Sequence, residues 1–263
     1  MKKILFIICT LVFSTALQAI ENDTIAPAPL EQEIPLTKEV ADSAYSAQKY
    51  DLAIQTYEAL LQKGVSATLY YNLGNSYFKA DKLGKAIVSY KRAALLEPSN
   101  SDIQFNLQLA IRKTIDKIEP VREIFFVYWF AALRDMMSAH QWAVIGIVSF
   151  LLLLLSITIY LVMRRRNVRK IIFTATLLLL LVTVMANVMG SQRKSLLLSK
   201  DKGIVIISNV VAKSTPDQSG TDLFVLHEGH ELTIKDNTIK GWVEVMLNNG
   251  NTGWIPVSSI EII

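Results

Sequence analysis

The sequence predicts a multidomain membrane protein in which all-α helical hairpins, a two-helix transmembrane hairpin and a small all-β barrel follow one another. Two uncharged stretches, residues 142–163 and 171–192, flank a short basic segment. The hydrophobic pattern before them has a helical period and repeats itself. After Lys200 the period becomes two and β-branched residues dominate. The 263 residues therefore divide into small modules rather than one large core.

The two uncharged stretches predict transmembrane helices 142–163 and 171–192. Each has 22 residues without Asp, Glu, Lys, Arg or His, and about 20 apolar residues suffice to cross a bilayer. A buried hairpin in a soluble core is the less favoured alternative, because globular helices need no such length. The loop 164–170 contains the basic residues Arg164, Arg165, Arg166, Arg169 and Lys170. Short basic loops stay in the cytoplasm, so we expect both flanking regions to lie together on the non-cytoplasmic side of the membrane.

Residues 1–19 have the order of a secretory signal peptide: two lysines, an apolar run and small residues. Cleavage after Ala19, cleavage after Ala16 and retention all remain open, and each exports the residues that follow. Cys9 is the only cysteine. The predicted exported domains therefore contain no disulfide.

The basic isoelectric point, about 9.0, comes from the predicted loop and leader. Residues 20–141 hold 13 basic and 15 acidic side chains, and residues 171–263 hold 7 and 8. Neither soluble region offers the strongly basic face that nucleic-acid binding requires. We therefore expect no nucleic-acid partner.

After a proline-containing linker, residues 20–37, residues 38–118 show helical periodicity with an internal repeat. Residues 53–57 (Ala-Ile-Gln-Thr-Tyr) recur 33 positions later as residues 86–90 (Ala-Ile-Val-Ser-Tyr). This period is typical of helical hairpins that stack into a solenoid. Residues 101–118 are predicted to cap the stack as a final helix.

The second copy resembles the tetratricopeptide repeat. The matching residues are Tyr70, Leu73, Gly74, Tyr77, Ala86, Tyr90, Ala93 and Pro98. The small ones permit close helix crossing, the large ones fill the space around it, and the proline ends the second helix.

The resemblance implies a concave groove that binds extended peptides. It places near that groove Lys38, Asp42, Tyr71, Asn75, Phe78, Phe105 and Arg112. The alternative is that these are ordinary surface residues. The clamp that some family members use for carboxylates is incomplete, because Tyr71 stands where it needs a lysine.

Residues 120–141 are rich in aromatic side chains with a polar fringe. Such a segment suits the headgroup layer of a membrane, so an interfacial helix is expected. Packing against the last repeat helix is the open alternative.

Residues 203–263 read as short strands separated by turns, with Asn248-Asn249-Gly250 as a hairpin turn. They resemble bacterial SH3-like domains, which implies a small barrel. The resemblance lies in residues 211–216, His227-Glu228-Gly229, Gly241-Trp242-Val243 and Gly253-Trp254-Ile255. Lys213 and Thr215 depart from the arginine and glycine of many relatives, so this loop by itself does not predict cell-wall binding.

The sequence contains no constellation of residues that indicates catalysis. His227 and His230 do not have the helical His-Glu-x-x-His spacing of zinc proteases, and no third ligand is in view. A metal-dependent enzyme would depend on these two residues. We expect no metal, no cofactor and no enzymatic activity.

The order of modules resembles the BatE-type proteins of the Bacteroides aerotolerance operon over nearly the whole chain. The resemblance implies an inner-membrane scaffold that acts with von Willebrand factor A-type Bat proteins and a MoxR-type ATPase in envelope stress tolerance. From the residues alone, the prediction is a membrane-anchored adaptor with two binding modules. A peptidoglycan-binding sensor, or a regulator of cell-wall enzymes through the SH3-like region, is the alternative.

Overall fold

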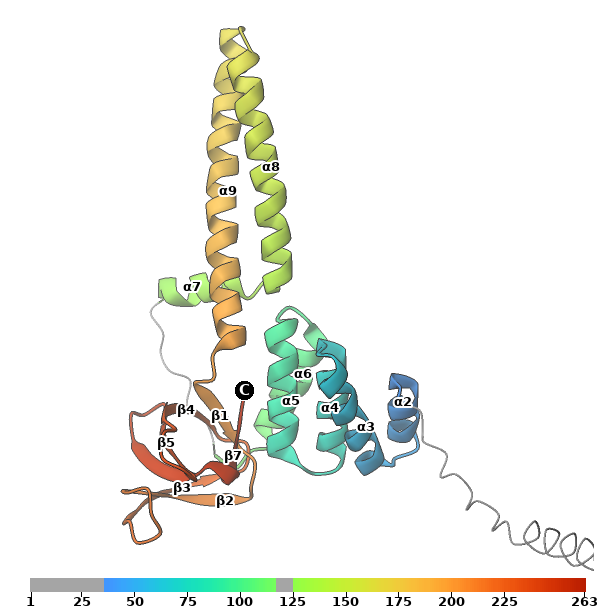
Figure 1. The fold of residues 1–263 in the computed structure, drawn as a ribbon, viewed down its shortest axis with the longest axis vertical. Coiled ribbons are helices and arrows are strands. Elements are labelled where there is room, and N and C mark those ends of the chain that lie inside the picture. Colours follow the sequence, from blue (N-terminus) through green and yellow to red (C-terminus); the bar gives the residue numbers. More distant parts are fainter. Residues whose placement is uncertain (1–35, 117–124) are drawn as a thin grey trace, which may run out of the picture. The chain divides into compact units, whose positions relative to one another are not determined.

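The computed structural model describes residues 36–116 and 125–263, which belong to one compact unit, Leu36–Ile263 (Figure 1). The predicted signal peptide 1–19, nearly all of the linker 20–37 and the start of the predicted interfacial segment lie outside the described residues.

Five short helices form the repeat region: α2 Lys38–Ser46, α3 Tyr50–Lys63, α4 Ala67–Lys79, α5 Leu83–Leu96 and α6 Ser101–Arg112. The hairpins α2–α3 and α4–α5 turn through Gln48 and Asp81, both with positive φ (59° and 58°) and 33 residues apart. The recurrence in sequence is therefore a recurrence of backbone geometry. Helix α6 ends at Arg112, earlier than the predicted 118, and the Thr114 hydroxyl then donates to the Ile111 carbonyl.

Alanines and one glycine bring the repeat helices into close contact. Ala41, Ala53 and Ala86 are completely buried, and Tyr90 is 1% exposed. A Cβ atom at Gly74 would lie 2.7 Å from Cδ1 and Cε1 of Tyr90. Only a residue without a side chain fits at this crossing.

The predicted membrane hairpin corresponds to α8 (Ala139–Val162) and α9 (Arg166–Leu198), preceded by the short helix α7 (Phe125–Arg134). The Ser138 hydroxyl and the Gln141 side chain form a capping box that starts α8 three residues before the predicted position. Arg166 already belongs to α9, so the turn is shorter than the predicted seven-residue loop. Helix α9 also continues past Gln192, and this extension brings Arg193 beside the repeats.

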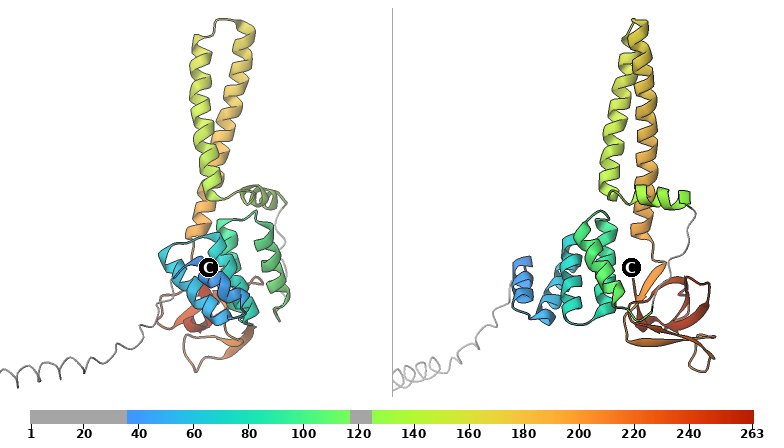
Figure 2. Two further views of the ribbon diagram at one scale, coloured as in Figure 1. Left: turned by 90° about the vertical axis from the view of Figure 1, so that its right-hand side faces the viewer. Right: turned by 180° about the vertical axis from the view of Figure 1, so that it is seen from behind.

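The two long helices pack along their length, as the views in Figure 2 show. Ser149 pairs with Thr183 at 3.0 Å and Ser156 with Thr176 at 2.7 Å. Most of their apolar side chains are exposed: only 17% of the most apolar window of α8 and 6% of that of α9 is buried. Both helices are long and apolar enough to span a membrane.

Helix α7 packs against this hairpin. Leu133 and Met137 lie against a small cluster formed by Trp142, Ala186 and Met189. The aromatic residues at the start of α7 remain exposed, with Phe125 and Trp129 both at 72%.

The C-terminal module is an antiparallel sheet of seven short strands. They are β1 Lys202–Val205, β2 Asn209–Lys213, β3 Asp222–His227, β4 Glu231–Asp236, β5 Trp242–Met246, β6 Thr252–Pro256 and β7 Ile260–Ile262, with a 3₁₀ turn η1 Val257–Ser259 before β7. Val205, Val245 and Ile255 are completely buried between them. Gly250 takes φ 87° in the predicted hairpin turn between β5 and β6.

The strand order is β3-β2-β6-β5-β4-β1-β7. Among the described strands, no pairing joins the ends β3 and β7, so the sheet is open and the predicted small SH3-like barrel is not confirmed. The strand pairings account for the open sheet. β1 pairs with β4 and β7, whereas β2 pairs with β3 and β6. Among the described strands, β7 pairs with β1 alone.

Candidate protein-binding groove and the junction beside it

The concave side of the repeats contains a cavity of about 310 Å³. Helices α2, α4, α5 and α6 line it with Tyr45, Tyr71, Asn75, Phe78, Lys79, Tyr90, Asn106 and Leu109. Tyr71, Asn75 and Phe78 follow one another at helical spacing, so one face of α4 supplies three of the eight lining residues. We call this cavity the groove.

A hydrogen-bond network holds the groove side chains. Asn106 Nδ2 donates to the Tyr71 hydroxyl oxygen at 2.9 Å and to Asn75 Oδ1 at 3.0 Å. The Tyr90 hydroxyl donates to the same Asn75 oxygen at 2.8 Å. Burial raises the pKa of Tyr90, so its hydroxyl remains a proton donor at physiological pH.

Two polar atoms of this network remain open to a ligand. Among the described residues, neither Asn75 Nδ2 nor Asn106 Oδ1 has a hydrogen-bond partner. One is a donor and the other an acceptor, which is the pair of groups that a peptide bond can satisfy.

The charge at the groove is positive. Lys79 lines it, and Lys113 Nζ lies 4.4 Å from the centroid of the Phe78 ring. The lining contains no carboxylate. The geometry therefore suits an extended peptide with an apolar or aromatic side chain for the rings and an acidic group near the lysines.

The structure brings together only three of the seven residues predicted near the groove: Tyr71, Asn75 and Phe78. Lys38 and Asp42 instead pair with each other at 2.5 Å, and Asp42 also accepts hydrogen bonds from Tyr57 and Asn72.

Phe105 and Arg112 do not line the cavity; both are exposed, Phe105 at 67%. The buried residues Ile103, Leu107 and Ala110 define the inner face of α6, and Phe105 points away from it. The spacing of these apolar residues is visible in the sequence, and it would have predicted Asn106 rather than Phe105 as a groove residue. Tyr45, Lys79, Tyr90 and Leu109 were also missed, because they flank the expected face or come from second helices.

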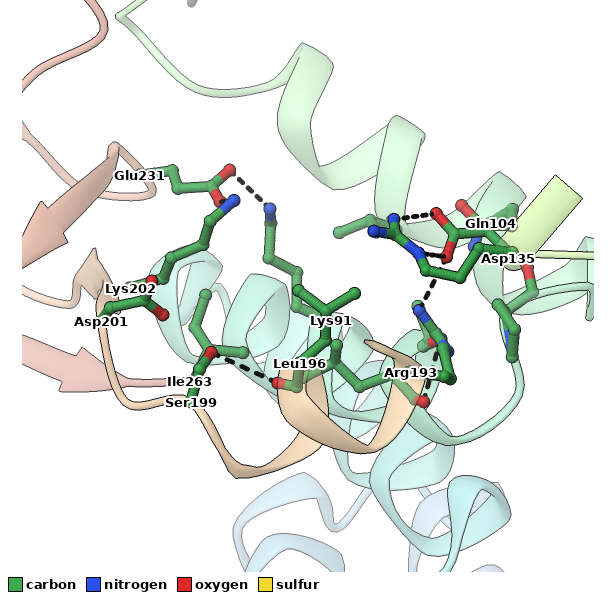
Figure 3. Close-up of a pocket in the computed structure, with 15 residues that line it drawn as sticks. Lys91, Gln104, Asp135, Arg193, Leu196, Ser199, Asp201, Lys202, Glu231 and Ile263 are labelled. Carbon is green, nitrogen blue, oxygen red and sulfur yellow. Dashed lines mark hydrogen bonds and ion pairs between the residues drawn. The ribbon is translucent and has the colours of Figure 1, made fainter. Parts of the chain in front are cut away.

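A second cavity, of about 320 Å³, lies where α5, α7, α9 and the sheet meet (Figure 3). Lys91 Nζ and Lys202 Nζ both approach Glu231, at 2.5 and 3.3 Å. Asp135 contacts Arg134 at 2.8 Å and Arg193 at 3.1 Å. The charges are thus largely balanced by pairs between separate elements, and we call this region the junction.

The sheet contacts the repeats at further points. Arg92 of α5 donates to Glu261 at 2.7 Å and to the Ile262 carbonyl. Asp116 accepts a hydrogen bond from the His227 N–H at 2.9 Å, and its carboxylate lies 2.8 Å from His227 Nδ1 and 3.2 Å from His230 Nδ1. These histidines connect modules. Within residues 36–116 and 125–263, no group of three or more His, Cys, Asp and Glu side chains is arranged to hold a metal.

Comparison with known families agrees with the helical repeat. Residues 67–100, which form α4, α5 and the turn after them, match the tetratricopeptide repeat. All eight residues predicted from the resemblance lie in this range. A search of curated proteins gives no match to the chain. The chain therefore contains a tetratricopeptide repeat, a unit that generally mediates protein–protein interaction.

Proposed function

We propose that this protein is a membrane-anchored scaffold whose groove binds an extended segment of a partner protein. The observation that carries the proposal is the groove itself: aromatic side chains, two open amide atoms and lysines without a carboxylate, on the concave face of a tetratricopeptide repeat. Aromatic side chains contribute strongly to binding energy when they are buried at an interface. The role requires no catalysis and no cofactor.

The exposure of the long helices supports a membrane anchor. A core helix of a soluble protein buries its apolar side chains, whereas the most apolar windows of α8 and α9 leave most of theirs uncovered. The exposed aromatic residues of α7 add a surface suited to the headgroup layer. The basic residues around the turn between α8 and α9 favour a cytoplasmic turn, with the repeats and the sheet in the periplasm.

At a finer level, we propose the role implied by the BatE-type resemblance. The repeats and an SH3-like C-terminal module would assemble von Willebrand factor A-type membrane proteins with a MoxR-type ATPase system in envelope stress tolerance. The order of modules supports this proposal.

The test replaces Tyr71, Asn75 and Phe78 together by alanine in the full-length protein. Partners that co-purify from native membranes after crosslinking should be lost, because two rings and an open amide disappear from one wall of the groove.

The matched control is the double variant Phe105→Ala and Arg112→Ala. It removes an aromatic and a charged side chain from the same repeat region but outside the groove, and it should keep the partners. Retention of all partners by the triple variant, with correct membrane insertion, would contradict the groove as the binding site. If both variants lose the partners, the binding surface includes the exposed face of α6 and is not the groove alone.

A further inference from the structure

Helix α5 has no side-chain cap of its own at either end. The side chain of its N-cap residue, Lys82, pairs with Asp51 and makes no capping hydrogen bond, and the last turn of α5 contains no basic residue. By contrast, the N-cap residues of α4 and α6 are Ser66 and Asn100, whose side chains accept backbone hydrogen bonds. The first N–H groups and last carbonyls of a helix need partners from outside the helix. Those of α5 must therefore come from elsewhere.

The sheet supplies the partner at the N-terminal end. The Gly84 N–H donates to Glu228 Oε1, in the turn between β3 and β4, at 2.7 Å. A Cβ atom at Gly84 would lie 2.5 Å from the Val205 carbonyl oxygen, so the contact is close. A carboxylate at this end is favourable because the helix dipole is positive there.

The membrane hairpin supplies the partner at the C-terminal end. Arg193 of α9 donates to the carbonyls of Ala94 and Leu95 at 2.8 and 2.9 Å, and it also bonds Asp135 (Figure 3). The guanidinium satisfies carbonyls that α5 leaves open, at the negative end of its dipole. We call these contacts the Arg193 seat.

Arg193 depends on these partners to remain buried. Arg193 is 4% exposed, and a buried charge is tolerated only while its partners are in place. If α9 moves away from the repeats, the guanidinium returns to water and the carbonyls of Ala94 and Leu95 lose their partners. The last turn of α5 is then free to fray.

The same turn leads into the wall of the groove. Tyr90 precedes Ala94 by four residues, lines the groove, donates to Asn75 and packs its ring against Gly74. We propose that α5 couples two sites: the contacts in the Arg193 seat and the ordered shape of the groove form and break together. Displacement of the membrane hairpin disorders the groove, and occupation of the groove holds the hairpin in its seat, as thermodynamic reciprocity requires. The consequence for partners rests on the proposed function; the coupling itself needs no ligand.

The test is hydrogen–deuterium exchange of the full-length protein in phospholipid nanodiscs, without any peptide. Arg193→Gln should accelerate exchange of the amides of residues 93–97 on the order of five- to thirtyfold, the effect of losing a buried charged cap. It should also accelerate exchange in residues 71–78 of α4 by at least about twofold. A change of that size exceeds the effect that independent sites usually have on one another.

The matched control is Lys194→Gln, which removes one charge from the adjacent, exposed position of α9 and should change neither segment. Arg193→Lys keeps the charge but lacks the planar fork that reaches two carbonyls. It should show a smaller increase of the exchange rate in both segments. If Arg193→Gln does not insert into the nanodisc, Arg193→Lys serves as the test variant.

Faster exchange confined to residues 93–97 would overturn the coupling and leave Arg193 a local cap. Unchanged exchange in both segments would overturn the cap as well. If the coupling is observed but the groove variants keep their partners, only the proposed peptide-binding function fails.

Discussion

Gly74→Ala tests how closely α4 and α5 are packed. The new methyl carbon would lie 2.7 Å from two atoms of the Tyr90 ring, well inside van der Waals contact. That ring is 1% exposed and its hydroxyl is bonded to Asn75, so it cannot swing away. The backbones must separate instead, and overpacking of this kind typically costs about 1–3 kcal/mol.

A gain in helix propensity opposes this cost. Alanine is favoured over glycine within a helix by about 1 kcal/mol. We therefore expect net destabilisation of about 1 kcal/mol, which lowers the melting temperature by about 2–4 °C for a cooperative unit of this size. Gly74→Leu should cost more, because it places a whole side chain in the same space. The assay is thermal unfolding of the detergent-solubilised protein followed by far-ultraviolet circular dichroism.

Gly64→Ala is the matched control. Gly64 follows α3, its φ of −179° suits any residue, and a Cβ atom there meets nothing within 4 Å. Its melting temperature should stay within about 1 °C of the wild type, in line with surface substitutions. A Gly74→Ala protein that melts at or above the Gly64→Ala protein would refute the packing described here.

Two further outcomes are expected. In a Cys9→Ser background, single cysteines at the exposed positions Ser43 and Ser219 should react with an impermeant thiol reagent in spheroplasts, and one at Asn167 should not. Labelling at position 167 alone would show that the protein has the opposite orientation in the membrane. Burial raises the pKa of Asp116, but hydrogen bonds from His227 and the nearby histidine charges lower it overall, below 3.8. A group with a lowered folded pKa stabilises the protein above its unfolded pKa and loses that contribution as the pH falls through the folded pKa. The melting-temperature difference between wild type and Asp116→Asn should therefore be present at pH 6 and shrink below pH 3.8; a constant difference would contradict the ionised contact.

Local residue patterns were enough to predict the helical repeats and the two long apolar helices. The spacing of Gly74, Ala86 and Tyr90 depends on contacts between neighbouring helices, which repeat with the sequence. The lack of charged residues in 142–163 and 171–192 can likewise be read residue by residue, without knowing which other element each residue contacts. Such features can be read from a single chain because their cause is local in sequence.

The junction and the full lining of the groove depended on tertiary structure. Nothing in the residues around Arg193 indicates that it bonds carbonyls about 100 positions earlier, or that Glu228 meets the start of the same helix. To predict the groove lining one must know how α6 is oriented about its axis, because that orientation places Asn106 in the groove and Phe105 in solvent. The open sheet depended on which strands pair, because β7 pairs with β1 and leaves β3 at the other end of the order. Each of these depends on how elements distant in sequence pack together, and that packing is decided by the whole fold rather than by neighbours along the chain.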